Sequence, residues 1–451
     1  MKELLKKYDI NAPRYTSYPT VPEWNETPKQ IDWEKLIVKQ VESGDGIALY
    51  IHLPFCKKRC WYCGCNSIIK KQTSHADNYL KDLFTEIDLA NAAAGTRLPV
   101  DQLHFGGGTP NFLDNGQMVK VMDKIEENFD LSETREIAIE LDPRLANNYQ
   151  LELLRKLGFT RVSMGIQDFD ADVQAAINRI QPVEMIRNLT EKCRELGFDS
   201  INYDLIYGLP KQNLKGFMQT LDHVLDLKPD RIALYSYAHM PQKIAHMSLI
   251  KDKDIPQSED KLSLFLTARD YLAQNGYEAI AMDHFALPED ELAQAAKAGT
   301  LHRNFMGYTV QDCKDSLGLG NSSISFMQGT FWQNEHELPD YKELIAQEKL
   351  PIKLGKSLNE DDIIRQDLIS ELMCNLQVVK EKFGKKHSLN FNEYFAEELK
   401  DLEQYQEDKL LKLHPDRIEI LENGRLLIRI IASAFDSYLK TNQQRQFSKV
   451  I

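Results

Sequence analysis

Residues 50–65 read Y-I-H-L-P-F-C-K-K-R-C-W-Y-C-G-C, and this stretch decides how the rest of the chain is interpreted. It holds four of the seven cysteines, Cys56, Cys60, Cys63 and Cys65. They directly follow an apolar run, Ile47–Leu53, which we expect to form a strand. Thiolates this close together repel one another unless a cation lies between them. The spacing therefore predicts a metal site rather than free or disulfide-paired cysteines.

The spacing also limits the kind of metal site. Structural zinc usually takes two separated ligand pairs, and the sequence holds no second C-x-x-C or H-x-H pair downstream. A C-x3-C-x2-C loop supplies three thiolates from one turn, which suits three corners of a [4Fe–4S] cluster and leaves one iron open to a substrate or cofactor. A zinc-binding interaction module is the remote alternative.

Composition sets further limits. With 451 residues, 42% of them hydrophobic, the chain can bury a large core, and we expect two or three structural units. A net charge of −13 argues against nonspecific binding to nucleic acid or to an anionic membrane. The other cysteines are scattered and odd in number, as in a reducing cytoplasm. The sequence shows neither a secretory signal nor an apolar run of about 20 residues, so we expect a soluble cytoplasmic protein.

From about residue 46 onward, apolar strand-like runs alternate with amphipathic helical patterns. The predicted strands are Ile47–Leu53, Asp101–Phe105, Glu136–Leu141, Arg161–Ile166, Ile201–Tyr207 and Arg231–Tyr237. Helical stripes between them include Leu80, Leu83, Phe84 and Ile87. Strict alternation predicts an α/β fold with a parallel sheet and right-handed crossovers, and six such units favour a barrel or partial barrel. A helix at Lys261–Ala273 and a strand at Tyr277–Asp283 would extend it.

Different patterns flank this region. Residues 1–35 contain prolines at 13, 19 and 22, which favour an extended arm whose Tyr15, Tyr18 and Trp24 pack on the body. We expect the main domain at 36–345 and a mainly helical, charged domain at 346–451. There, we expect a helix at 361–378. Residues 416–421, the turn at Gly424 and residues 425–439 together resemble a winged-helix unit. Because its acids are interleaved with its bases, we expect a structural cap that binds no nucleic acid.

In a barrel of this kind, chemistry sits where the strands end. The second predicted strand is followed by G-G-G-T-P at 106–110, which lets the backbone approach a ligand closely. Glu140 lies at the end of the third predicted strand, and Gln167 lies at the end of the fourth. The fifth predicted strand carries Asp204 within an apolar run. A buried carboxylate is costly unless it is paired, so each acid predicts either a ribose diol or a structural ion pair as its partner. Arg179 could form a bidentate ion pair with a carboxylate, or it could lie on the surface.

Taken together, these features resemble one family. The C-x3-C-x2-C loop is the signature of the radical S-adenosylmethionine (SAM) superfamily, and Y-I-H-L-P-F-C-x3-C-x-Y-C-G-C closely resembles the oxygen-independent coproporphyrinogen III oxidases. Further matching stretches are Y-T-S-Y-P-T at 15–20, Y-A-H at 237–239, M-D-H-F-A at 282–286, L-H-R-N-F-x-G-Y-T at 301–309 and Q-F-S-K-V-I at 446–451. The resemblance covers nearly the whole chain and implies a six-stranded (βα)6 partial barrel.

The resemblance also implies site residues. Cys56, Cys60 and Cys63 would hold the cluster, while Cys65 would be a catalytic residue and not a ligand. The implied SAM contacts are Tyr50, Tyr62, Gly107, Gly108, Thr109, Glu140, Gln167, Arg179, Asp204, Ala238 and Ile324. The family accommodates two SAM molecules, with Thr109 and Ile324 at the second. Met306 stands where the family commonly has glutamine, and it would lie near that second molecule.

The implied reaction is the oxidative decarboxylation of two propionates of coproporphyrinogen III to vinyl groups. A 5′-deoxyadenosyl radical would take a hydrogen atom from each propionate, and loss of carbon dioxide and one electron would follow, giving protoporphyrinogen IX for haem synthesis. An electron donor and an electron acceptor, both unidentified, would be needed, and we expect a monomer. The alternatives are a haem chaperone with the same barrel and cluster, or a SAM-dependent enzyme that modifies haem.

Overall fold

The computed structural model describes residues 4, 7, 8 and 10–441. These residues form two compact units, each of which is described by itself. The larger unit holds residues 26–276 and 313–357, and the smaller holds residues 1–25, 277–312 and 358–451. The predicted match at 446–451 lies outside the described residues.

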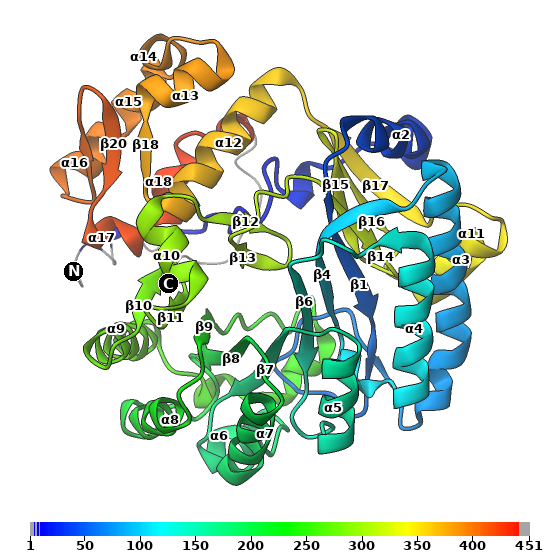
Figure 1. Ribbon diagram of the computed structural model, residues 1–451. Helices are drawn as coiled ribbons and strands as arrows, with labels where there is room; N and C mark the ends of the chain where they lie inside the picture. Colours follow the sequence, from blue (N-terminus) through cyan, green and yellow to red (C-terminus); the bar gives the residue numbers. More distant parts are fainter. Residues whose placement is uncertain (1–3, 5–6, 9, 442–451) are drawn as a thin grey trace. The chain divides into compact units, whose positions relative to one another are not determined.

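A parallel sheet forms the framework of the larger unit (Figure 1). Its strands are β1 (Ile47–Leu53), β4 (Leu98–Gly107), β6 (Glu136–Leu141), β7 (Arg161–Gln167), β8 (Ser200–Tyr207) and β9 (Arg231–Ser236). Each strand pairs in parallel with the next, for example Ile51 with Phe105 and Phe105 with Ile139. All six coincide with or overlap the predicted strands. The predicted α/β class with a (βα)6 partial barrel is therefore confirmed.

Helices connect these strands and pack side by side on the outside of the sheet (Figure 1). They are α2 (Trp33–Ser43), α3 (Ala76–Ala94), α4 (Asn115–Asn128), α5 (Asn148–Lys156), α6 (Ala171–Ala176), α7 (Val183–Glu195), α8 (Leu214–Leu227) and α9 (Ser258–Gln274). On α3 the predicted stripe faces inward, with Leu83 and Ile87 fully buried. Capping residues fix where several helices begin. Asp114, for instance, accepts a hydrogen bond from the Gln117 N–H at the start of α4.

The sheet continues beyond β1 in a way that the alternation of strands and helices did not predict. β14 (Ser316–Leu319) pairs in parallel with β1, and β15 (Ile324–Met327), β16 (Thr330–Asn334) and β17 (Ile352–Ser357) follow in antiparallel order. Helix α11 (Leu338–Ala346) connects β16 to β17 and packs on α3. As a result β1 has a hydrogen-bonded neighbour on each side, β4 and β14.

Short elements surround the cysteines. Strands β2 (Phe55–Cys56) and β3 (Ile68–Ile69) pair in parallel, and β5 (Phe129–Asp130) pairs with the start of β4. The 3₁₀ turns of this unit are η2 (Pro28–Gln30), η3 (Thr73–His75), η4 (Pro110–Phe112), η5 (Ala245–Leu249) and η6 (Asp252–Asp254).

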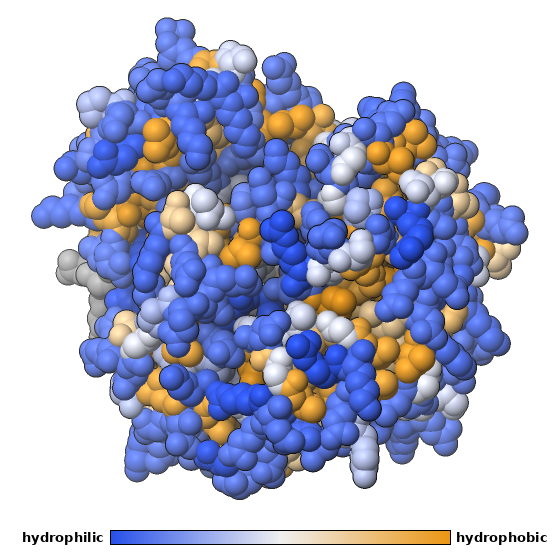
Figure 2. Space-filling model, in the orientation of Figure 1, coloured by the Kyte–Doolittle hydropathy of each residue, from blue (hydrophilic) through white to orange (hydrophobic). Residues whose placement is uncertain are grey.

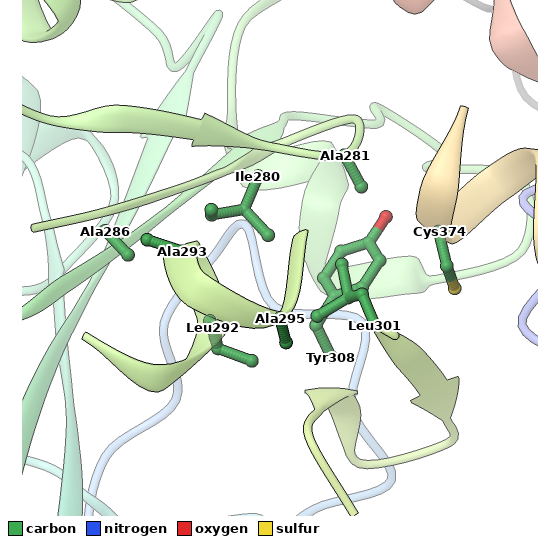
Figure 3. Close-up of a cluster of buried hydrophobic side chains, with 9 residues drawn as sticks. All are labelled: Ile280, Ala281, Ala286, Leu292, Ala293, Ala295, Leu301, Tyr308 and Cys374. Carbon is green, nitrogen blue, oxygen red and sulfur yellow. The ribbon is translucent and has the colours of Figure 1, made fainter. Parts of the chain in front are cut away.

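The smaller unit has two parts of secondary structure. Two antiparallel pairs, β10 (Glu278–Ile280) with β11 (His284–Ala286) and β12 (His302–Asn304) with β13 (Gly307–Thr309), flank α10 (Glu291–Ala298). The predicted strand 277–283 is shorter, because the chain turns at Ala281, whose φ is +46°. A cluster of buried side chains, including Ile280, Leu292 and Tyr308, holds this part together (Figure 3).

Helix α12 (Glu360–Asn375) opens the second part, followed by a three-stranded antiparallel sheet in the order β18 (Gln377–Val379), β20 (Arg417–Ile420) and β19 (Leu411–Leu413). The short helices are α13 (Lys380–His387), α14 (Phe391–Tyr394), α15 (Ala396–Asp401), α16 (Glu403–Glu407), α17 (Glu422–Arg425), α18 (Ile428–Ser433) and α19 (Ser437–Thr441). In the stretch that resembled a winged-helix unit, β20 is followed by three short helices, α17, α18 and α19. The helix predicted at 361–378 ends at Asn375, because Leu376 adopts a left-handed conformation with φ of +58°.

The proline-rich arm packs on the C-terminal part of its own unit. Tyr15 donates a hydrogen bond to Asp436 (2.9 Å), and Arg429 donates to the carbonyl groups of Ala12 and Pro13. Tyr15, Tyr18 and Trp24 are all buried, as their aromatic character predicted. The arm is not wholly irregular, because η1 (Val21–Glu23) interrupts it and α2 already begins at Trp33.

None of the described helices is both long and apolar enough to cross a bilayer. On the face of the molecule in Figure 2, hydrophilic side chains predominate and hydrophobic ones are dispersed among them.

Candidate active site

The cysteine loop leaves the carboxyl end of β1 and is tied down from several directions. The N–H of Ile68 donates to Pro54 O (2.7 Å) and that of Lys70 to Cys56 O (3.0 Å), which closes the base of the loop. The Trp61 N–H donates to Ile177 O (3.0 Å), and the Asn178 side chain donates to Arg59 O (2.8 Å). His246 Nε2 lies 2.7 Å from Cys63 O. The loop is therefore held in one conformation by elements that follow β1, β7 and β9.

Each of the three predicted ligands has its own polar neighbour. Cys56 Sγ lies 3.2 Å from the hydroxyl of Thr109, and Cys60 Sγ accepts from Arg179 (3.5 Å) and from Arg144 (3.6 Å). Cys63 Sγ accepts from the backbone N–H of Cys65 (3.5 Å). Cys60 is buried, Cys56 and Cys63 are half-buried, and Cys65 is exposed.

Two arginines and one carboxylate lie behind Cys60. Asp142 forms ion pairs with Arg144 (2.6 Å) and Arg179 (3.4 Å), and all three side chains are nearly inaccessible to water. Burial alone would raise the pKa of Asp142, but the two guanidinium groups hold it below its ordinary value. One carboxylate cannot neutralise two guanidinium groups. A positive charge therefore remains beside the Cys60 sulfur.

The thiols respond differently to their surroundings. A hydrogen bond from the Cys65 side chain, aided by the charges of Arg179 and Arg59, lowers the pKa of Cys63 to about 6. The same contact with Cys63 raises the pKa of Cys65 well above its ordinary value. Burial raises the pKa of Cys56 to about 11, while the Thr109 hydroxyl opposes this rise. At neutral pH the loop thus favours a thiolate at Cys63 and a thiol at Cys65.

This donor set fits a [4Fe–4S] cluster. Three cysteines on one turn lie within electrostatic range of one another, and buried cations stand beside them to stabilise thiolates. Among the described residues, no three His, Cys, Asp or Glu side chains converge on a single metal ion. A cubane does not require such convergence, because each of its thiolates binds a different iron.

The glycine triplet lies directly against the cysteine loop. A Cβ on Gly108 would lie 2.5 Å from Pro54 O, so only glycine fits there, and the Gly108 N–H donates to Leu53 O (2.9 Å). Gly107 has a φ of +118°, which L side chains rarely adopt. The triplet therefore lets Thr109 reach Cys56.

The side chains of Tyr50, in the middle of β1, and Glu140, near the end of β6, lie together. A Cβ on Gly106 would lie within 3.0 Å of both side chains, so the glycine makes room for them. Tyr50 stacks on His104 with ring centroids 6.0 Å apart, and its hydroxyl lies 3.2 Å from His52 Nδ1. His104 Nε2 is 3.4 Å from Glu140 Oε1, and the Glu140 side chain keeps 45% of its surface exposed, so its carboxylate remains accessible to a ligand.

Gln167 and Arg179 meet at the end of β7. Gln167 has a left-handed backbone with φ of +67°, and its side-chain nitrogen and that of Arg179 both lie within 2.9 Å of where a Gly165 Cβ would be. Arg179 Nη2 donates to Gly165 O (2.7 Å). Tyr62 is close to this pair: burial raises its pKa well above the ordinary value, and the charge of Arg179 opposes the rise.

The remaining predicted residues lie further along the sheet. Asp204 is half-buried in β8 and accepts from Ser163 (3.1 Å) and Asn202 (2.9 Å). Ala238 follows β9, between Tyr237 and His239, whose side chains are 2.7 Å apart. Ile324 opens β15, two strands from β1. Met306 belongs to the β12–β13 turn of the smaller unit, where its N–H donates to Asn304 (2.8 Å).

Sequence reasoning missed Asp142, Arg144, Arg59 and His246. Asp142 and Arg144 belong to the run E-L-D-P-R at the end of the third strand, so their place at a strand end was a usable signal. His246 lies 183 residues from Cys63 in the chain, and no local pattern links the two.

Comparisons with known proteins agree with this geometry. Residues 50–224 match the radical SAM superfamily, and residues 358–427 match the HemN C-terminal domain. The chain is 41% identical to the oxygen-independent coproporphyrinogen III oxidase of Pseudomonas aeruginosa, covering 100% of this chain and 98% of the relative. It is 43% identical to that of Escherichia coli, covering 99% and 98%.

A solved structure of Escherichia coli coproporphyrinogen III oxidase (HemN), presented as a radical SAM enzyme, superimposes with a TM-score of 0.92. The match covers 97% of this chain and 99% of that one, at 41% identity. Similarity of this extent spans both compact units and the cysteine loop. The chain therefore belongs to the oxygen-independent coproporphyrinogen III oxidase family of radical SAM proteins.

Proposed function

We propose that this protein catalyses the oxygen-independent oxidative decarboxylation of coproporphyrinogen III in haem synthesis. Two propionate side chains become vinyl groups, and the product is protoporphyrinogen IX. Each conversion removes one hydrogen atom, one carbon dioxide and one electron from the substrate. The observation that carries the proposal is the three-cysteine loop at the end of β1, in a chain that matches named coproporphyrinogen III oxidases along its whole length.

Cys56, Cys60 and Cys63 would hold a [4Fe–4S] cluster. When bound, the reduced cluster and SAM supply a 5′-deoxyadenosyl radical that takes a hydrogen atom from the propionate. The protein positions the reactants and excludes water. Arg144 and Arg179 both donate to the Cys60 sulfur, and the single carboxylate of Asp142 leaves positive charge beside the proposed ligands. Cys65 keeps its proton and would serve as a catalytic residue rather than as a ligand.

SAM would bind across the strand ends. The proposed contacts are Tyr50, Tyr62, Gly107, Gly108, Thr109, Glu140, Gln167, Arg179, Asp204, Ala238 and Ile324. Tyr50 and Glu140 lie together, as do Gln167 and Arg179, and this clustering supports one binding site at the ends of β1, β6 and β7. A second SAM molecule, contacted by Thr109 and Ile324, is part of the proposal. A polar contact at the position of Met306 would be missing.

We further propose that the protein works as a cytoplasmic monomer and takes electrons from a separate donor. An acceptor would remove the final electron from the substrate. The division into an arm at 1–35, a catalytic domain at 36–345 and a C-terminal domain at 346–451 likewise stays a proposal.

The test is an anaerobic assay. The cluster is reconstituted, dithionite, SAM and coproporphyrinogen III are added, and the porphyrinogens are followed by mass spectrometry. We expect two successive losses of a carboxyl group as carbon dioxide. 5′-Deoxyadenosine should form in parallel with them. The Cys60→Ser protein serves as the control.

Other outcomes would point elsewhere. Cleavage of SAM without porphyrinogen turnover would contradict the proposed substrate and favour an enzyme that modifies haem or another tetrapyrrole. A fully loaded cluster that cleaves no SAM would favour a haem chaperone.

A further inference from the structure

Four lysines border the cysteine loop on its water-exposed side. Lys57 and Lys58 lie between Cys56 and Cys60, and Lys70 and Lys71 directly follow β3. Lys57, Lys58 and Lys71 are exposed, and Lys70 is half-buried. We call these four residues the basic edge.

The fold brings the two lysine pairs to the same end of the loop. Strand β2 ends at Cys56 and pairs with β3, and the Lys70 N–H donates to Cys56 O (3.0 Å). Arg59, the residue after Lys58, donates to Ser67 O (3.1 Å). Both pairs therefore lie within a few residues of a proposed cluster ligand, and on the strand pair that fixes the loop.

These lysines differ from the other cations near the cysteines. Arg144 and Arg179 are buried and form ion pairs with Asp142. In contrast, within residues 4, 7, 8 and 10–441, no carboxylate lies at ion-pair distance from any lysine of the basic edge. Residues 54–76 contain five Lys or Arg and no Asp or Glu, although the whole chain carries a net charge of −13. The positive charge is thus concentrated on the exposed side of the cysteine loop.

A local group of exposed lysines on an acidic protein can steer a negatively charged partner to one place on its surface. A negatively charged protein is repelled by most of an acidic surface and attracted only by a local cationic patch, so the patch orients its approach. Unpaired lysines in water contribute to encounter rates more than to stability, and salt screens their effect beyond about 10 Å.

We propose that the basic edge is the docking surface for a small acidic protein that carries single electrons. The carrier is oxidised by one electron, the [4Fe–4S] cluster is reduced by one electron, and no proton or covalent bond moves in this step. The inference rests on the proposed function, which requires an electron from outside. Carboxylates of the substrate are the competing ligands, but the substrate must reach SAM at the strand ends, where the cations are the buried arginines rather than exposed lysines.

The test uses an acidic flavodoxin as probe and the cluster-loaded enzyme. The variants are Lys57→Glu/Lys58→Glu and Lys70→Glu/Lys71→Glu. The control is Lys35→Glu/Lys39→Glu, which makes the same charge change at two exposed lysines of α2. Binding is measured by calorimetry at low and high salt. Contacts are mapped by carbodiimide, which links lysines directly to carboxylates.

We expect the Kd of the wild-type complex to rise with salt, and the Kd of each basic-edge variant to be at least about 10-fold weaker. The control should stay within about 2-fold, and the crosslinks should map to the basic edge. An unchanged Kd in the basic-edge variants, or crosslinks confined to other lysines, would overturn the proposal.

Turnover with dithionite separates this inference from the proposed function. Dithionite is too small to need a docking surface, so the basic-edge variants should match wild type with it while turning over more slowly with reduced flavodoxin. A raised KM for coproporphyrinogen III in the dithionite assay would instead assign the lysines to the substrate and overturn the docking proposal. If wild type itself fails to turn over with dithionite, the proposed function fails, whereas the binding measurement still decides whether the basic edge docks an acidic protein.

Discussion

Two of the places where the larger unit buries a carboxylate show opposite ways of stabilising it. Beside the cysteine loop, Asp142 is held ionised by Arg144 and Arg179. Behind β1, the carboxylate of Glu86 on α3 is fully buried and is surrounded by neutral donors. Gly320 N–H (2.8 Å), Asn334 (2.6 Å) and Tyr341 (2.6 Å) all donate to it. Burial raises the pKa of Glu86 to about 7, although these hydrogen bonds oppose the rise.

The difference separates a functional from a structural use of buried charge. Ion pairs near the cysteines leave excess positive charge where a metal cluster needs thiolates. The donors around Glu86 carry no charge of their own, but they connect α3 to the turn after β14, to β16 and to α11. We therefore expect changes in the first cluster to affect activity and changes in the second to affect stability and its dependence on pH.

The largest effect should come from the cysteines themselves. Cys60→Ser should lose nearly all of its iron, and its decarboxylase activity should fall at least about 1,000-fold, because a hydroxyl does not replace a thiolate as an iron ligand. Iron and sulfide analysis and electron paramagnetic resonance of the reduced protein check this. Cys193→Ala, on α7, is the control and should keep its iron. Full iron content in Cys60→Ser would refute the assignment.

The second largest effect should come from Arg179→Gln. It leaves Asp142 paired with Arg144 alone and removes the hydrogen bonds to Cys60 and to Gly165 O. We expect the free energy of unfolding of the apo-protein to fall by about 3 kcal/mol. We also expect kcat/KM for SAM to fall about 100-fold. Urea denaturation and steady-state kinetics measure these changes.

Arg187→Gln is the matched control for this change, since Arg187 pairs with Asp226 on the surface, and its loss should leave the stability nearly unchanged. If Arg179→Gln lowered stability but left the kinetics for SAM unchanged, the buried cations would be structural only, and the contrast with Glu86 would disappear.

Glu86→Gln should change the pH dependence of stability with little effect on activity. The pKa of an unfolded glutamate is about 4.3, and that of Glu86 is about 7, so between these values the folded state holds a proton that the unfolded state has released. Wild-type stability therefore falls as pH rises through this window, by up to about 3 kcal/mol from this one group. Glutamine cannot ionise, so the variant should lack that fall.

Urea denaturation between pH 5 and pH 8 checks this prediction. The stability of the variant relative to wild type should increase steadily with pH and level off above pH 7. A constant difference across the range would mean that Glu86 does not titrate there.

The smallest effect should come from Tyr341→Phe. This change removes one donor to Glu86 and keeps the ring that stacks on Tyr79 at 5.8 Å. We expect a loss of about 1 kcal/mol. The loss should be larger at pH 8 than at pH 5, because the missing hydrogen bond stabilises the ionised carboxylate. Tyr394→Phe, which loses an exposed hydrogen bond to Asp361, should show neither effect. An equal loss at both pH values in Tyr341→Phe would contradict the assignment.

Much of the framework was predictable, because its signals are local. Strands β1 and β6 have the bounds that their apolar runs predicted, and the cysteine loop follows β1 as expected. Strands β14–β17 were missed, since each is short and the alternation of helices and strands ends before them. One local signal was available. Gln328-Gly329 between β15 and β16 has φ of +49° and +75°, which is the tight hairpin turn that a polar residue followed by glycine favours.

The chemistry of the candidate site was only partly predictable. The cysteine spacing and the glycine triplet can be recognised from sequence, because backbone geometry restricts which residues fit. The role of Glu86 cannot, since it depends on partners that folding brings together. Glu86 accepts hydrogen bonds from residues 234 to 255 positions away. The SAM contacts and the role of Cys65 stay predictions.

The position of β1 has a consequence for the order of assembly. Because this strand is paired on both sides, its amide groups are protected by the whole sheet, whereas residues 57–67 form an excursion fixed by a few bonds. We therefore expect that iron and sulfide are inserted after the polypeptide has folded, when the bonds that fix this excursion open while the sheet stays intact. Damage to the cluster by oxygen would likewise leave a folded, refillable apo-protein rather than an unfolded one.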